Sequence, residues 1–276
     1  MAKAISAPVK RERVSRPALT TWIRRIVFYV LLLVAWQLFA NTGIIPAYNL
    51  PGPSDVVASL GNLLQSRQLL PAIGATMTRL VVGYAISLAI GVVLGLLIGC
   101  FRAVEDTVGS LVLGLQALPS VCWLPLGILW FGLSDQAIIF VVAMGAIFSI
   151  TLGVNEGIKN TPPVYLKAAR NLGARGLALA VQVILPAALP AIFSGLKQGW
   201  TFAWRSLMAG ELIYFTVSLG NLLQQGRDNL DPAQVMAVMV VIIAISVLIE
   251  NLIFGPIERR MRERRGLGFA TSIKQP

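Results

Sequence analysis

The chain of 276 residues has no histidine, only two cysteines and few charged residues. The lack of histidine excludes Ser-His-Asp and Cys-His nucleophile systems and histidine-ligated metal sites. Cys100 and Cys122 lie in apolar stretches and form neither a metal-ligand pattern nor a disulfide framework, so we expect structural, reduced thiols. No glycine precedes a lysine, which excludes the GxxxxGK[ST] phosphate loop of an ATPase.

The balance of charged and apolar residues indicates a membrane protein. Charged residues make up 13% of the chain and hydrophobic residues 56%, whereas about a quarter of a soluble domain is charged. The net charge of +11 could point to nucleic acid. The long apolar runs favour another explanation of the positive charge, because membrane proteins concentrate Lys and Arg on their cytoplasmic flanks.

Six apolar runs predict an all-α integral membrane protein with six transmembrane helices. The expected spans are 26–46, 80–101, 107–134, 136–155, 186–215 and 233–255. Basic tails precede and follow them, over 1–25 and 256–276, so the membrane domain is 26–255. The basic start resembles a signal peptide, but the following run is long and no cleavage site is clear, so we expect a retained helix.

The distribution of basic residues predicts the topology. The predicted cytoplasmic segments hold 18 of the 23 Lys and Arg residues, which are seven in the first tail, Arg102, four in the loop 159–190 and six after Gly255. Outside, only Arg67, Arg79 and Arg227 are candidates. This bias favours a multi-pass protein with both termini in the cytoplasm.

Two of the expected spans have features of a transport core. Gly91, Gly95 and Gly99 are four residues apart, which predicts a small face where another helix approaches closely. In the span 107–134, Pro119 and Pro125 flank Trp123 and are expected to bend or break the helix, which is tolerated where protein or a cavity surrounds it. One subunit cannot easily enclose a path, so we expect both features in a core shared by two copies.

The fifth expected span carries charges at membrane depth, Lys197, Arg205 and Glu211, which usually face the interior or a cavity. Arg205 is the candidate for an anionic substrate, because a guanidinium holds a sulfonate or carboxylate through two parallel hydrogen bonds. Glu211 could pair with Arg205 when the path is empty, or contact another subunit. Alternatively, the two residues form a structural network and Lys197 extends to the cytoplasmic interface.

The segment Lys159–Pro190 predicts two short helices joined at Gly173. We expect Thr161 to cap a helix whose first turn holds Pro162 and Pro163. Gly173 suits the position just after a helix, and a second helix is expected from about Gly176 toward Pro186. Elsewhere, Ser54-Asp55 predicts a short interfacial helix over 56–64.

This segment resembles the "EAA" loop of binding-protein-dependent ABC importer permeases. That pattern is Glu-Ala-Ala, three residues, Gly, nine residues and Ile-x-Leu-Pro. The chain matches it with Ala168, Ala169, Gly173, Leu185 and Pro186, while Lys167 replaces the Glu and Val183 the Ile. The sequences LPGPSDV, Leu50–Val56, and LQALPSVCWLPLGILWFG, Leu115–Gly132, resemble the nitrate, sulfonate and taurine branch, some relatives of which carry bicarbonate.

The resemblance implies a type I importer permease that catalyses no reaction itself. It further implies a homodimer in a bacterial inner membrane, two cytoplasmic ATPase subunits that hold ATP and Mg, and an external substrate-binding protein that contacts the loop Thr216–Asp231. Residues 167–169, 173, 185 and 186 would couple the chain to the ATPase, with no cofactor of its own. The residues do not fix the substrate.

Two other classes remain as alternatives. A self-contained secondary transporter or channel would use Lys197, Arg205 and Glu211 for ion coupling, but it has no ATPase for an EAA loop to contact. A membrane enzyme is disfavoured, because the chain lacks histidine, clustered carboxylates and an activated nucleophile.

Overall fold

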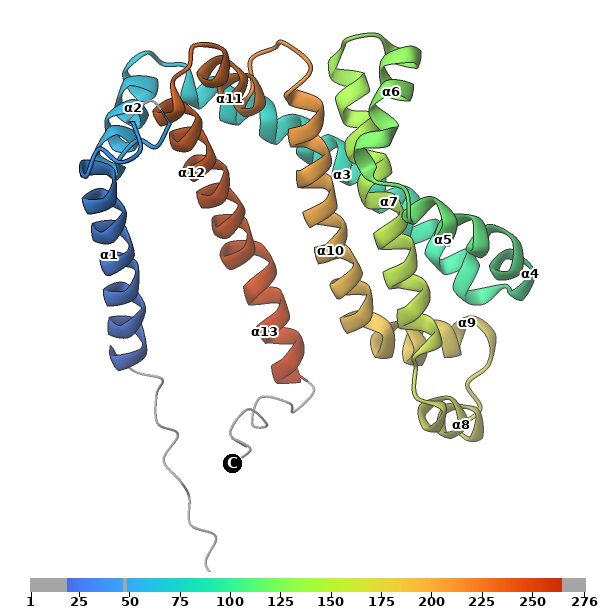
Figure 1. Ribbon diagram of the computed structural model, residues 1–276. Coiled ribbons are helices and arrows are strands. Elements are labelled where there is room, and N and C mark those ends of the chain that lie inside the picture. The colour runs from blue at the N-terminus through green and yellow to red at the C-terminus, as the bar shows by residue number, and fades with distance from the viewer. Residues whose placement is uncertain (1–18, 47–48, 265–276) are drawn as a thin grey trace, which may run out of the picture.

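The computed structural model describes residues 19–46 and 49–264, which are helical with no strand. Long helices run between two ends of the molecule (Figure 1). We call one the α8 end, after the short helix α8 (Pro163–Asn171). The other is the α11 end, which carries α2 (Pro53–Gln65) and α11 (Leu219–Asp228).

Five helical segments are long and apolar enough to cross a membrane. They are built on α1 (Leu19–Asn41), α3 (Leu69–Cys100), α7 (Asp135–Lys159), α10 (Leu185–Glu211) and α12 (Pro232–Ile249). A bent pair over 102–131 makes a sixth if it counts as one span. The expected all-α architecture with six crossings therefore agrees with the described residues.

Several boundaries differ from those expected. α1 begins at Leu19, inside the predicted tail, and α3 begins at Leu69 rather than Leu80. The fifth span is helical over Ala180–Glu211 rather than to Phe215, and α13 (Gly255–Arg264) extends the last span into the second tail. Helices continue past the apolar run because their backbone bonds are made regardless of side-chain polarity. Residues 1–18 and 265–276 of the two tails lie outside the described residues.

The third expected span is broken, and only one proline breaks it. The chain runs through α4 (Arg102–Val104), a π turn (Glu105–Gly109) and α5 (Ser110–Gln116), and resumes in a 3₁₀ turn (Ser120–Trp123) and α6 (Leu124–Phe131). The two halves meet at 103°. Pro119 is extended at the break, with φ −55° and ψ 133°. Pro125 lies in the first turn of α6, where a missing N–H is harmless, so it does not bend the helix as expected.

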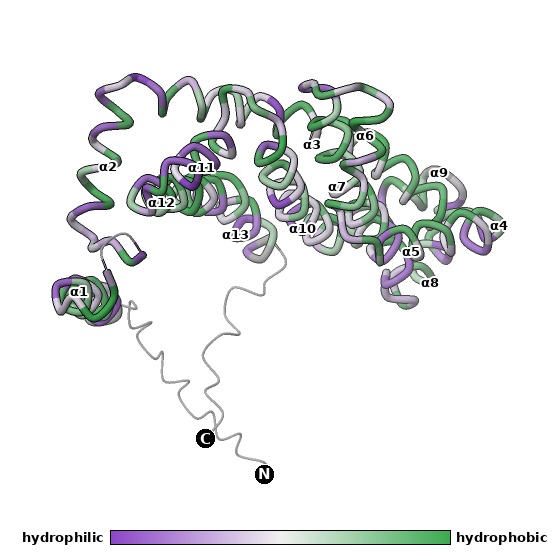
Figure 2. The backbone as a smooth tube through the Cα atoms, turned by 45° about the horizontal axis from the view of Figure 1, so that its top comes forward, coloured by the Kyte–Doolittle hydropathy of each residue, from purple (hydrophilic) through white to green (hydrophobic). Residues whose placement is uncertain are grey.

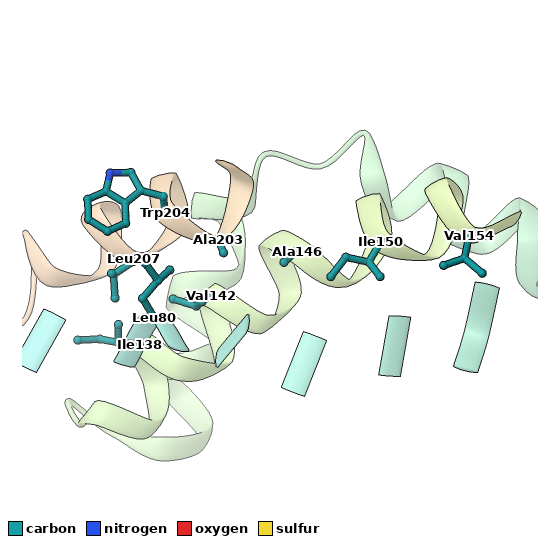
Figure 3. Close-up of a cluster of buried hydrophobic side chains, with 9 residues drawn as sticks. All are labelled: Leu80, Ile138, Val142, Ala146, Ile150, Val154, Ala203, Trp204 and Leu207. Atoms are coloured by element: carbon teal, nitrogen blue, oxygen red, sulfur yellow. The ribbon is translucent and has the colours of Figure 1, made fainter. Parts of the chain in front are cut away.

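Helix α7 is the centre of the subunit and packs between α3 and α10. Most of its apolar side chains are buried. Figure 3 shows the main cluster, in which Leu80 of α3 and the α10 residues Ala203, Trp204 and Leu207 meet the α7 row Ile138, Val142, Ala146, Ile150 and Val154. This core holds α3 and α10 at fixed positions relative to α7.

Glycines bring these helices close together. A Cβ added at Gly91, Gly95 or Gly99 would come within 2.6–2.9 Å of atoms of α7. On the other side of α7, a Cβ at Gly153 would lie 2.4 Å from the Cα of Gly195 in α10. The predicted glycine face is therefore used inside the subunit, and the expectation that two copies share it is wrong.

The remaining helices form a looser flank. α12 packs on α2 and α11 through a small apolar cluster that includes Leu63, Leu219 and Val238. Helix α1 stands apart, as Figure 2 shows, and no residue of its span is buried. Its Gln37 side chain accepts a hydrogen bond from the Ser54 amide at the start of α2. Cys100 and Cys122 are free and both are exposed, so neither is a packed structural thiol.

We predict that Gly153→Ala lowers the free energy of unfolding by about 1–3 kcal/mol, because the new methyl group overlaps the α10 backbone at Gly195. Gly74→Ala is the matched control, since Gly74 also lies in a long helix and has open space around its Cβ position. That change should leave stability equal or higher. Thermal unfolding of the two variants in detergent tests this, and equal midpoints would contradict the packing described.

Candidate functional site

Arg205 borders a cavity of about 330 Å³ between the broken span, α7 and α10. Pro119 and Trp123 line the same cavity, so the structure brings three of the predicted path residues together. Pro125 and Glu211 do not line it. Its polar lining also includes Gln116, Ser120 and Ser149. The break at Pro119 opens this space, because an unbroken helix would run straight across it.

A second cavity of about 380 Å³ lies on the other side of Arg205, toward α12. It is lined by Trp200, Thr201, Trp204, Arg205, Ser246, Val247 and Glu250. The Arg205 side chain is exposed on the subunit. Within residues 19–46 and 49–264, no ion pair or side-chain hydrogen bond involves it. Arg205 therefore presents a positive charge that is not ion-paired within the described residues and that borders two cavities.

Glu211 belongs to a different site. Its carboxylate is fully buried and accepts hydrogen bonds from Thr76 Oγ1 at 2.9 Å, Arg79 Nη1 at 3.0 Å and the Gly220 amide at 3.2 Å. The interpretation that Glu211 pairs with Arg205 is wrong. The reason is helical geometry, since six residues turn the two side chains of α10 to different sides.

Sequence reasoning placed Arg79 outside and assigned it no role, yet its side chain is buried. Besides Glu211, it donates from Nε to Asp135 at 3.1 Å and from Nη2 to Thr216 Oγ1 at 3.2 Å. One feature of the sequence indicates this role of Arg79. Thr76 and Arg79 are three residues apart and share a face of α3 once that helix begins at Leu69.

This network orders the connection from α10 to α11. The Leu219 amide donates to Thr76 Oγ1 at 3.0 Å, and the carbonyl of Val217 accepts from Arg79. A Cβ at Gly220 would lie 2.4 Å from the Cβ of Glu211, so only glycine allows the start of α11 to lie this close to the end of α10. The Ser218 hydroxyl accepts a hydrogen bond from the Asn221 amide and caps α11. The loop at the α11 end is thus tied to α3, α7 and α10.

Lys197 forms ion pairs with Glu250 and, at 3.6 Å, with Glu258. The three charges of the fifth span are therefore separated. Lys197 pairs with Glu250 and Glu258 at the end of the last span, Glu211 pairs with Arg79 of α3, and Arg205 borders the cavities. They do not form the shared cluster that an ion-coupled carrier would use. The alternative of a self-contained secondary transporter loses its structural basis in this arrangement.

The segment between α7 and α10 forms the predicted pair of helices, with corrections. α8 ends at Asn171, and Gly173 two residues later turns the chain with a φ of +89°. The Gly173 amide donates to Arg170 O and the Ala174 amide to Ala169 O, which is the two-bond Schellman ending. Thr161 does not cap α8. Its hydroxyl donates to Gly157 O, and Pro162 precedes the helix instead.

The second helix does not stop at Pro186. α9 (Gly176–Leu179) passes through a π turn (Ala180–Ile184) into α10, and Leu185 and Pro186 occupy the first turn of α10. A proline is accepted there without breaking the helix. Ala169 is buried and anchors α8, whereas Lys167 and Ala168 are exposed.

Comparison with known proteins decides the family. Residues 87–263 match the family described as the binding-protein-dependent transport system inner membrane component. The chain belongs to this family. It is a permease of the ABC transporter class and a multi-pass inner membrane protein, so its family supplies the membrane subunit and not the ATPase.

Individual relatives cover most of the permease. It is 31% identical over 227 residues to the putative aliphatic sulfonates transport permease protein SsuC of Escherichia coli, covering 81% of this chain and 86% of that one. It is 25% identical over 240 residues to the nitrate import permease protein NrtB of Synechocystis, covering 84% of this chain and 86% of that one. The fold is similar to a chain of the MetNI methionine ABC transporter, with TM-score 0.63, 21% identity and coverage of 71% and 97%.

We predict that Arg79→Met destabilises the permease by about 3–5 kcal/mol, because it leaves the buried Glu211 carboxylate without its cation. Adding Glu211→Gln should recover much of this loss, since a neutral amide still accepts from Thr76 and Gly220. Arg227→Gln is the control. Arg227 forms an exposed pair with Asp228, which is worth about 0–1 kcal/mol. Thermal unfolding in detergent measures all three, and no recovery in the double variant would refute the pairing.

Proposed function

We propose that the permease is the membrane-spanning subunit of an ATP-driven importer, that it forms the path for a small anionic solute, and that α8 couples it to a separate cytoplasmic ATPase. The observation that carries the coupling is the exposed apolar surface of α8. The solute class is supported by Arg205 and by the sulfonate and nitrate permeases among the relatives.

The surface of α8 is suited to insertion into a groove on another protein. Val164, Ala168 and Leu172 are spaced four apart and share one face, and Tyr165 lies beside them. Leu172 is 88% exposed and Val164 71% exposed. A helix of this kind at a water-facing end would leave apolar side chains in solvent unless a partner covers them. Lys167, on the same short helix, offers a cation where the family pattern has an acid.

A movement of α8 would be transmitted to the cavities through α7 and α10, the two long helices that α8 connects. α8 is joined to α7 by a short turn and to α10 through α9 and the π turn. The Schellman ending and the buried Ala169 keep α8 attached as a unit. At the same end, Lys159 of α7 pairs with Glu105 beside α4, so the broken span is also held. ATPase motion at α8 would therefore displace α7 and α10, the helices that border Arg205.

The α8 end is assigned to the cytoplasm. The start of α1 and the end of α13 lie toward this end (Figure 1), in keeping with both termini being cytoplasmic and with the distribution of Lys and Arg. The α11 end then faces an external substrate-binding protein, with the segment Thr216–Asp231 as its contact. A second copy supplies the rest of the path, and two ATPase subunits hold ATP and Mg.

The test of coupling is co-purification of a partner ATPase with tagged permease carrying Leu172→Glu. We predict loss of the associated ATPase activity, because a carboxylate replaces an apolar contact in the proposed groove. Leu230→Glu is the matched control. Leu230 is 84% exposed but lies at the α11 end, so this variant should retain the ATPase. Retention of the ATPase by both variants would sink the proposal that α8 is the coupling helix.

A further inference from the structure

Beyond Pro190, the exposed residues of α10 differ in kind from those in the middle of α3 and α12. Between Pro190 and Glu211, four residues are exposed, and all four are polar: Ser194, Gln198, Thr201 and Arg205. The apolar residues of this stretch are buried or half-buried. A membrane helix that faced lipid would show the reverse pattern, since polar groups are costly in hydrocarbon.

Other spans of the same subunit show the lipid-facing pattern. On α12, the exposed residues between 237 and 249 are all apolar: Met239, Val240, Ile243, Ala244, Val247 and Leu248. On α3, every exposed residue between 80 and 99 is likewise apolar. The exposed polar face of α10 is therefore not a general property of this chain's surface, and it needs water or protein opposite it.

The four polar residues form a continuous stripe. At about 100° per residue, Gln198, Thr201 and Arg205 lie within about 40° of Ser194 around the helix. The stripe spans twelve residues, or about 16 Å along the axis. Arg205 is six residues from Glu211, about 9 Å inward from the α11 end. The stripe thus runs from the α8 side of the bilayer toward Arg205.

The two cavities lie at the Arg205 end of this stripe. Arg205 borders both of them, and Thr201 borders the one toward α12. Across the first cavity from Arg205, Gln116 and Ser120 add an amide and a hydroxyl from the broken span. Glu250 borders the second cavity, where it pairs with Lys197 rather than with Arg205. A guanidinium that faces neutral donors across the first cavity and has no carboxylate paired to it suits a monovalent oxyanion such as a sulfonate or nitrate.

We propose that this stripe, Ser194, Gln198, Thr201 and Arg205, is the wall of the water-filled path and that Arg205 is its anion-binding residue. The inference rests on the proposed function and deepens it by naming the residues of the wall and the residue that binds the anion. The exposed side of the stripe requires a second wall, which a second copy of the chain supplies. Oxyanions pass from Arg205 along the amide and hydroxyl groups toward the α8 end.

Cysteine labelling tests the path independently of transport. In a Cys100→Ser, Cys122→Ser background, single Ser194→Cys, Gln198→Cys and Thr201→Cys variants of the whole complex react with an anionic, membrane-impermeant methanethiosulfonate. Leu189→Cys and Ile243→Cys are controls. Leu189 lies about 140° around α10 from Ser194, and Ile243 is on the apolar face of α12.

We predict that the stripe thiols react about ten-fold or more faster than the controls, because the reactive thiolate is strongly disfavoured in lipid. Equal rates would overturn the path assignment. Slow stripe labelling with disulfides between copies would also overturn it, by making the stripe a dry interface. Since ATPase co-purification is measured separately, failure here is distinguishable from failure of the coupling proposal.

Substitution of Arg205 tests the anion site. In proteoliposomes with the ATPase and binding protein, we predict that Arg205→Gln lowers uptake of labelled nitrate or ethanesulfonate about ten-fold or more, from the lost charge-assisted hydrogen bonds. ATP hydrolysis should persist. Arg205→Lys should recover part of the uptake, because it retains charge without the paired bonds. Arg102→Gln, an exposed arginine away from the cavities, is the control.

Unchanged uptake in Arg205→Gln would overturn the anion role. Loss of both uptake and ATP hydrolysis, with no recovery in Arg205→Lys, would make Arg205 structural and overturn it equally. A wild-type complex that moves neither anion would overturn the anion assignment alone, and the labelling result would still decide whether the stripe lines a path.

Discussion

The close packing of α7 between α3 and α10 is the constraint on which the rest of the permease depends. Lipid tails are as apolar as the side chains, so burial alone drives little helix association in a bilayer, and contact at short range must do so. Glycines supply that contact on both sides of α7, with Gly91, Gly95 and Gly99 on one side and the Gly153–Gly195 crossing on the other. Once these three helices are fixed, the side of α10 turned away from α7 is fixed as well.

Polar groups then divide into two kinds according to their partners. Arg79, Glu211 and Thr76 are buried and saturate one another, so they stabilise a connection and offer nothing to a solute. Arg205 is exposed at two cavities and makes no ion pair within the described residues. Both arginines are costly in hydrocarbon, yet only the second has unused donors. This difference, rather than charge itself, separates a structural arginine from a candidate binding arginine.

The sequence was sufficient to predict the helical class, the approximate spans, the break near Pro119 and the turn at Gly173, because each depends on local properties such as hydrophobic length, a missing N–H or a positive φ. It did not predict the partners of Glu211, because Thr76 and Arg79 lie far away in the chain and meet it only through packing. The early start of α3 was missed for a related reason. Arg79 ends the apolar run in the sequence, but a membrane helix accepts an arginine when carboxylates such as Asp135 and Glu211 lie beside it. Pro125 was misjudged because its effect depends on its position within a helix, which composition does not reveal.

Helix α10 connects the two functional ends of the permease. Its α8 side continues through the π turn and α9 into the exposed coupling surface, and its other end is tied by Glu211 to α3 and to the start of α11. Between them lie the polar stripe and Arg205. Because glycines pack α10 closely on α7, we expect a displacement applied at α8 to move the proposed stripe together with the helix. A partner that shifted α11 would act on the same helix through the buried carboxylate of Glu211. In the proposed importer, one helix would therefore relay both contacts to Arg205.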